Sequence, residues 1–210
     1  QFEPRLVEGT TFVDLSRRPA EYFLERDLAD HVIGWIHNQK ANAPDRPFFV
    51  YYAPGTAHSP VQAPREWIAR FRGHFDMGWD RLREQTLARQ KSLGIVPAST
   101  DPTPRPEQIP AWADMDAAER AVSARHMEVY AAMLAFQDAQ FGRILDELKR
   151  MGILETTLIV FVEGDNGGSM EGGLDGTLNE AGSMANGLEE SLPQRLARLD
   201  QFGGRTTMEA

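Results

Sequence analysis

Two short apolar runs are the clearest pattern along the chain. Residues 48–52 and 157–162 are continuous stretches of aromatic, β-branched and aliphatic side chains, and each is followed by turn-forming residues. Such runs are typical of strands that are buried on both faces, as in a parallel sheet. The second run follows a long helical pattern, and helix followed by strand supplies half of a right-handed crossover. We therefore predict an α/β fold with a mostly parallel sheet.

Helical spacing of apolar residues predicts four helices. The first begins after Pro19, with Ser16 as a possible cap, and the others cover residues 64–71, 79–93 and 117–150. Five prolines between residues 97 and 110 predict an extended connection without regular structure. The side chains expected to face inward are Leu24, Leu28, Val32, Trp35, Ile36, Trp67, Ile68, Phe71, Met127, Tyr130, Met133, Leu134, Phe141, Ile144, Leu145 and Leu148.

The two ends of the chain differ from its centre. Residues 1–18 show little periodicity and are expected to be irregular, and residues 171–210 form a glycine-rich, polar tail. Within the tail, residues 188–199 have the pattern of one amphipathic helix, whereas residues 206–210 carry no closing element. We expect one domain over residues 1–210, with the tail covering an active site or contacting residues beyond the chain.

Composition narrows the possible functions. The 210 residues are 41% hydrophobic and 25% charged, which is ordinary for a globular domain. A formal charge of -9, with 22 basic residues scattered among 31 acids, argues against a nucleic-acid partner. The absence of cysteine excludes disulfides and a cysteine nucleophile within these residues. The sequence has no apolar run long enough to span a membrane. It has neither a starting Met nor a signal-peptide core, so we expect an internal segment of a longer protein. Periplasmic and cytoplasmic locations both stay open.

Candidate chemistry follows each of the two apolar runs. Asp165 and Asn166 lie in a glycine-rich loop just beyond residue 162, and their oxygens suit a hard cation such as calcium or magnesium. His58 follows the first run by six residues. Because the carboxyl ends of parallel strands meet at one edge of a sheet, where ligands bind, we expect His58 and Asp165 to lie close together. The other histidines, His31, His37, His74 and His126, are expected to be surface or packing residues.

These motifs together resemble the middle of a type I arylsulfatase. The similarity rests on residues 47–60, 64–67, 127–130 and 162–173, which follow one another in the order found in that family. It implies the alkaline-phosphatase-like α/β/α sandwich, incomplete in this chain, and a role as the central part of a single sulfatase catalytic domain. It also implies a sulfuric ester hydrolase that acts on small-molecule sulfate esters.

The resemblance further implies roles for individual residues. Asp165 and Asn166 would be ligands of a calcium ion, and His58 would donate to the sulfate or to its leaving oxygen. The nucleophile of the family is a formylglycine made from Cys or Ser in the motif C/S-x-P-x-R. That motif is expected upstream of this segment, so the 210 residues alone are expected to be inactive and to need the remainder of the domain as a partner.

One sequence match and two rival functions stay open. Ser191 to Arg195 fits S-x-P-x-R, but it follows the Asp165 loop, in the wrong order, and we expect a solvated helix with Leu192, Leu196 and Leu199 buried. The first rival function is hydrolysis of phosphate or phosphonate monoesters on the same scaffold. The second is a binding or structural module that has lost the nucleophile.

Overall fold

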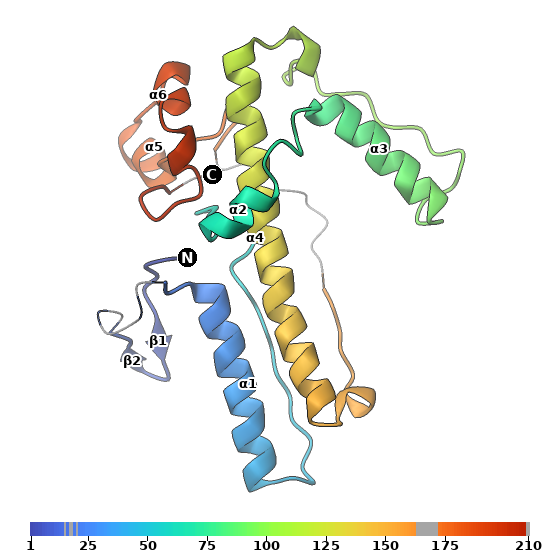
Figure 1. Cartoon of the computed structure of the whole chain (residues 1–210), viewed down its shortest axis with the longest axis vertical. Helices are drawn as coiled ribbons and strands as arrows, with labels where there is room; N and C mark the ends of the chain where they lie inside the picture. The colour runs from blue at the N-terminus through green and yellow to red at the C-terminus, as the bar shows by residue number, and fades with distance from the viewer. Residues whose placement is uncertain (15, 17–18, 20, 163–171, 209–210) are drawn as a thin grey trace.

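A long helix, α4 (Ala117–Arg150), is the axis on which the other elements pack. The computed structural model describes residues 1–14, 16, 19, 21–162 and 172–208. Helices α1 (Leu24–Asn42), α2 (Arg65–Arg70) and α6 (Leu192–Leu196) contact α4, and the glycine-rich tail with α5 (Glu180–Asn186) lies beside its first turns (Figure 1). The remaining elements are the helix α3 (Gly78–Ser92), the short 3-10 helices Trp112–Asp114, Leu154–Thr156 and Leu199–Gln201, and the strands β1 (Val7–Glu8) and β2 (Thr11–Phe12).

The bounds of α4 agree with those predicted from the sequence. Asp116 caps its start by accepting from the N–H of Ala118 and of Glu119, while the Glu119 carboxylate accepts from the N–H of Asp116. Its end is marked by Gly152, whose φ of +72° is a conformation that favours glycine. Local side-chain and backbone chemistry therefore fixes both ends of the helix.

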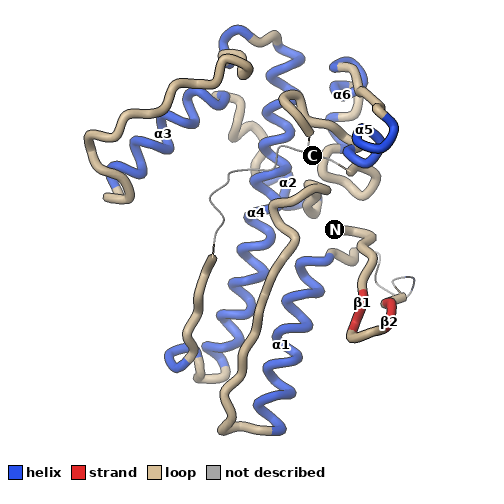
Figure 2. The backbone as a smooth tube through the Cα atoms, turned by 180° about the vertical axis from the view of Figure 1, so that it is seen from behind, coloured by secondary structure: helices blue, strands red, loops and turns tan. Residues whose placement is uncertain are grey.

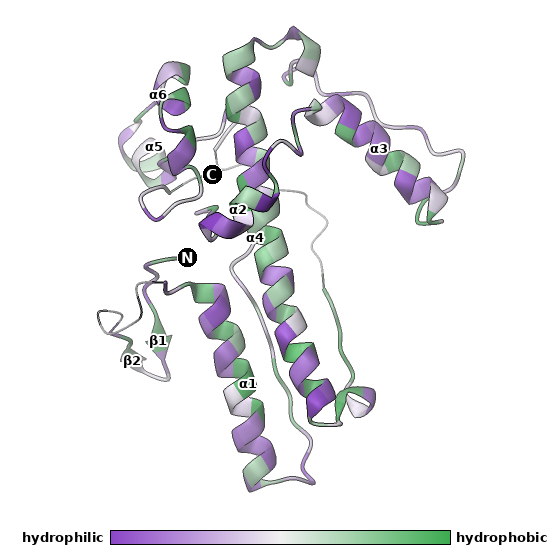
Figure 3. Cartoon of the chain, in the orientation of Figure 1, coloured by the Kyte–Doolittle hydropathy of each residue, from purple (hydrophilic) through white to green (hydrophobic). Residues whose placement is uncertain are grey.

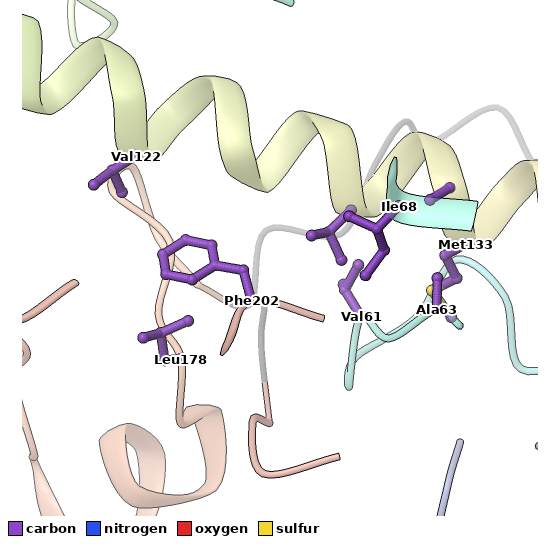
Figure 4. Close-up of a cluster of buried hydrophobic side chains, with 9 residues drawn as sticks. Val61, Ala63, Ile68, Val122, Met133, Leu178 and Phe202 are labelled. Atoms are coloured by element: carbon purple, nitrogen blue, oxygen red, sulfur yellow. The ribbon is translucent and has the colours of Figure 1, made fainter. Parts of the chain in front are cut away.

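The face that α4 buries differs from the predicted stripe. Met133, Ile144 and Leu148 are buried as expected, but Met127 is 37% exposed and Leu134 is 42% exposed. The core cluster lies on the neighbouring face, where α2, the chain before it and the tail converge (Figure 4). Its members are Val61, Ala63, Ile68, Val122, Val129, Ala132, Met133, Leu178 and Phe202. The buried face includes small residues such as Ala132, which let other elements approach α4 closely.

The two apolar runs are extended, but they form no sheet in the described part of the chain. Residues 48–52 lead back from the C-terminal end of α1, and residues 157–162 lead back from the C-terminal end of α4. The two runs point in the same direction (Figure 2). The sheet that the described residues contain is the antiparallel pair β1 and β2, in which Val7 pairs with Phe12 and Glu8 with Thr11. The described residues are thus mainly helical, and the predicted parallel sheet is not confirmed.

Many side chains of the two apolar runs are exposed to solvent. Phe49 and Tyr51 are each 83% exposed, and Leu158 is 88% exposed. Residues 157–162 are coloured as hydrophobic in Figure 3, so apolar side chains of this run are open to solvent. Residues 48, 50 and 52 are less exposed than 49 and 51, which is the period-two alternation of a strand. One face of the 48–52 run therefore has a covering layer, and the other face does not.

Three further predictions are corrected. The first helix begins at Leu24, with Phe23 at the N-cap position and no side-chain cap, so Ser16 does not cap it, and Trp35 is 46% exposed. The predicted tail helix is divided into α6 and the 3-10 helix Leu199–Gln201, with Leu196 38% exposed. The end of the chain does have a closing contact, since Met208 forms a parallel bridge with Asn179.

No helix in the described segments combines the length and the apolar character that a membrane span requires.

Candidate functional site

His58 lies in a loop just beyond the carboxyl end of the 48–52 run. The N–H of His58 donates to the carbonyl of Gly55 at 3.0 Å, which closes a tight turn, and the side chain is exposed. Its Nδ1 atom is 3.0 Å from the carbonyl oxygen of Ser59. A carbonyl can only accept, so Nδ1 carries the proton in this contact. The second ring nitrogen, Nε2, is then a donor only when the ring is an imidazolium.

A buried carboxylate holds the loop on the side before His58. Glu25, in the first turn of α1, has no exposed surface, and its Oε1 accepts from the hydroxyl of Thr56 at 2.9 Å. Burial raises the pKa of the Glu25 carboxyl, while the hydrogen bond from Thr56 works in the opposite direction. The loop and α1 are thus joined through a polar contact inside the protein.

A second carboxylate holds the loop on the side after His58. The hydroxyl of Ser59 donates to Oε2 of Glu180, the first residue of α5. The backbone of Glu180 is fixed in turn, because its N–H donates to the carbonyl of Met208 at 2.9 Å. The contact therefore connects the His58 loop to the tail, 121 residues away in sequence.

The chain that follows the loop is built into the core. Gln62 donates from Nε2 to the carbonyl oxygens of Gly204 and Thr207, at 3.1 and 2.6 Å, and the N–H of Ala63 donates to Gly203 at 3.2 Å. Val61 and Ala63 are members of the core cluster. An exposed imidazole is thus carried by a segment whose continuation is buried and hydrogen-bonded.

One aromatic side chain connects the ends of the two apolar runs. The ring of Phe141 on α4 stacks on Tyr52 with centroids 6.2 Å apart, and the ring of Phe161 lies 6.3 Å from Phe141. Burial, with a smaller contribution from the charge of Glu25, raises the pKa of Tyr52 to about 12. The segments that lead to His58 and toward residue 163 therefore end on the same part of α4.

The predicted metal ligands cannot be placed in the same way. Asp165 and Asn166 lie outside the described residues, so their proximity to His58 stays a prediction. Within the described ranges, no group of three or more His, Cys, Asp or Glu side chains could hold a metal ion.

The other histidines have packing contacts. His31 lies 2.8 Å from the carbonyl of Asp27, and His37 contacts Glu147 and so connects α1 to α4. The ring of His74 packs on Phe71, and that of His126 lies 4.7 Å from the ring of Phe202. These contacts agree with the expectation that they are surface or packing residues.

The match to S-x-P-x-R has a structural role. Ser191 is the N-cap of α6 and forms a capping box with Gln194. Arg195 is only 7% exposed, and its guanidinium donates to the carbonyl oxygens of Asp175 and Gly176. The helix is therefore not simply solvated, because Arg195 fixes the glycine-rich tail against it.

Glu25 and Glu180 were not identified from the sequence. Glu25 did carry a signal, since it lies on the same helical face as Ala29 and Ile36, which are buried. An acid on the apolar face of a helix indicates a buried partner. Glu180 carried no comparable signal, because its partner Ser59 is distant in sequence.

Comparison with known proteins identifies the family. The family model named Sulfatase matches residues 5–196. The chain is 37% identical to an arylsulfatase of Klebsiella aerogenes over 149 residues, which is 71% of this chain and 31% of that protein. It is 35% identical to an uncharacterised sulfatase of Schizosaccharomyces pombe over 147 residues, which is 70% of this chain and 26% of that protein. The chain thus spans less than a third of the length of either relative, and it belongs to the sulfatase family.

Proposed function

We propose that this chain is the central part of a catalytic domain that hydrolyses sulfate esters, with aryl sulfates as the first substrate class to test. The observation that carries the proposal is the fixed placement of His58, just beyond the carboxyl end of the 48–52 run, in a chain that belongs to the sulfatase family. The arylsulfatase of Klebsiella aerogenes, to which the chain is similar, has the activity that its name states.

His58 supplies a proton donor to the reacting sulfate in this proposal. When the bond between sulfur and the ester oxygen breaks, negative charge develops on that oxygen, and a nearby N–H stabilises it. Since Nδ1 donates to the carbonyl of Ser59, Nε2 is the nitrogen that would face the ester. The imidazolium form is then required, and its Nε2 proton passes to the leaving oxygen to give the free alcohol or phenol.

Asp165 and Asn166 would hold the metal ion that the sulfatase family implies. Both side chains offer hard oxygen donors, which fits calcium, and an amide at position 166 adds no nitrogen ligand of the kind that softer metals prefer. Such an ion withdraws charge from the sulfate oxygens when it is bound. The nucleophile expected in this family, a formylglycine, would come from residues outside this chain.

The exposed apolar runs give the rest of the domain a place to bind. Phe49, Tyr51 and Leu158 are largely exposed, and the sandwich that the family implies would cover this surface with further strands and a second layer. In the complete protein, the backbone amides of residues 49–51 and 158–162 should then be protected from hydrogen exchange. Free exchange of these amides would contradict the proposed sheet.

The central test is made on the complete protein with an aryl sulfate. We expect Asp165→Ala to lose most of the bound calcium and of the activity, because it removes a charged ligand, and His58→Ala to lose activity while keeping the calcium. Glu155→Ala, at an exposed position, is the matched control and should retain both properties. Calcium binding at the wild-type level in Asp165→Ala would contradict the metal assignment.

The same protein separates the rival functions. Matched aryl sulfate and aryl phosphonate esters compare the two hydrolase activities directly. Faster turnover of the phosphonate would favour the first rival, and no turnover of either ester would favour a binding module. Ser191→Ala should keep its activity, since Ser191 caps α6, and loss of all activity would show that Ser191 takes part in the chemistry.

A further inference from the structure

Two carboxylates contact the residues on either side of His58. Glu25 accepts from the hydroxyl of Thr56, two residues before the histidine, and Glu180 accepts from the hydroxyl of Ser59, one residue after it. The two acids belong to different helices, α1 and α5, so the contacts approach the loop from separate parts of the fold (Figure 1).

The contact of Glu180 is coupled directly to the imidazole. Ser59 uses its hydroxyl to donate to Glu180 and its carbonyl oxygen to accept from Nδ1 of His58. A shift of Ser59 therefore moves the atom that orients the ring. Because the backbone of Glu180 is itself bonded to Met208, this chain of contacts ends on a fixed part of the tail.

The burial of Glu25 is costly for the fold. Removing a carboxylate from water is costly unless its partners compensate, and an apolar side chain of similar size is often equally stabilising at such a place. Glu25 is nonetheless fully buried, on the face of α1 that also carries Ala29 and Ile36. What a carboxylate provides there, and an apolar residue does not, is the acceptor for Thr56.

We propose that Glu25 and Glu180 are positioning residues for His58, which hold the loop from its two sides so that the imidazole meets the sulfate in one orientation. This inference rests on the proposed role of His58. Neither acid touches the substrate: Glu180 acts through the hydroxyl of Ser59, and Glu25 acts through the hydroxyl of Thr56 and the backbone of Gly55 and Thr56. Displacing a catalytic group by about 1 Å can lower the rate by about 100-fold.

The test uses kinetics of the complete protein with an aryl sulfate. We expect Glu180→Ala and Thr56→Val each to lower kcat by about 10- to 100-fold with a smaller change in KM, because each variant removes one of the side-chain contacts that orient the loop. Glu180→Gln should recover most of the loss, since its amide oxygen can accept from Ser59. Glu189→Ala, an exposed acid nine residues further along the tail, is the matched control and should keep the wild-type kcat.

A double mutant separates positioning from a general structural effect. If Glu180 acts through His58, adding Glu180→Ala to His58→Ala should lower kcat no further. A full, additive loss in that background, or a wild-type kcat in both Glu180→Ala and Thr56→Val, would overturn the inference while leaving the proposed function intact. Wild-type activity of His58→Ala itself would instead remove the proposed role on which the inference rests.

Discussion

Replacing Phe202 by alanine should loosen the segment that follows His58. The Phe202 side chain is 1% exposed and belongs to the core cluster, and its ring lies 4.7 Å from that of His126. Transfer of a buried Phe to water costs about 1.5–3 kcal/mol, and the cavity that remains raises the loss for Phe→Ala to about 3–5 kcal/mol. We therefore expect the part of the core around Phe202 to lose stability of that order.

The loss should be visible at particular amides. The N–H of Ala63 donates to Gly203, the neighbour of Phe202, and the N–H of Met208 donates to Leu178, another member of the cluster. Hydrogen exchange of the complete protein should show faster exchange at Ala63 and Met208 in Phe202→Ala, and a smaller increase in Phe202→Leu, which refills part of the space.

A matched control is available at Phe12. Its side chain is 78% exposed, so Phe12→Ala should change stability by less than about 0.5 kcal/mol and leave both amides as they are in the wild type. Wild-type exchange at Ala63 and Met208 in Phe202→Ala would refute the conclusion that this side chain holds the loop and the tail together.

Three other predictions concern the same part of the fold. Gly203→Ala should cost about 1–3 kcal/mol more than Gly94→Ala in thermal unfolding, because both glycines have φ +70° but a Cβ at Gly203 would lie 2.5 Å from Val129. Hydrogen bonds from Arg150, and then from His37, hold the pKa of Glu147 below its ordinary value of 4.5, so its contribution to stability is present above that value and is lost as the pH falls through the lowered pKa. Urea unfolding of Glu147→Gln should therefore depend less on pH in the acid range, and a curve that parallels the wild type would refute this. Burial, and then the charge of Glu25, raise the pKa of Tyr52 to about 12, so ultraviolet titration should show a lower midpoint in Glu25→Gln, with Tyr52→Phe identifying the signal.

The helices were predictable because their signals are local. Both ends of α4 depend on residues within a few positions of each other, Asp116 with Glu119 at the start and Gly152 at the end. The buried face of α4 was harder to predict, because it depends on which elements from distant parts of the chain pack against the helix. Phe202 and Val61 converge on the part of α4 that carries Val129, and the position of Met127 relative to them is not a local property.

The surroundings of the candidate site were predictable only in part. The position of His58 after an extended run follows from the sequence, and the structure agrees with it. The contacts that hold the loop do not follow, since Thr56 and Glu25 are 31 residues apart and Ser59 and Glu180 are 121 apart. The sequence does not indicate which carboxylate a given hydroxyl will contact. These pairs come together only because α1 and the tail pack on α4.

The direction of the helices explains why the two candidate centres should meet. Helices α1 and α4 pack side by side and run the same way, and each is followed by an extended run that returns along it (Figure 1). Two units of the same order and direction must bring the ends of their extended runs to the same side, which is what the common contact of Tyr52 and Phe161 with Phe141 reflects. His58 follows one of these ends, and Asp165 follows the other within three residues of position 162. The topology of the described residues therefore supports the predicted convergence of the imidazole with the candidate metal ligands, and a structure of the complete protein with Asp165 at the far end of α4 would contradict the prediction.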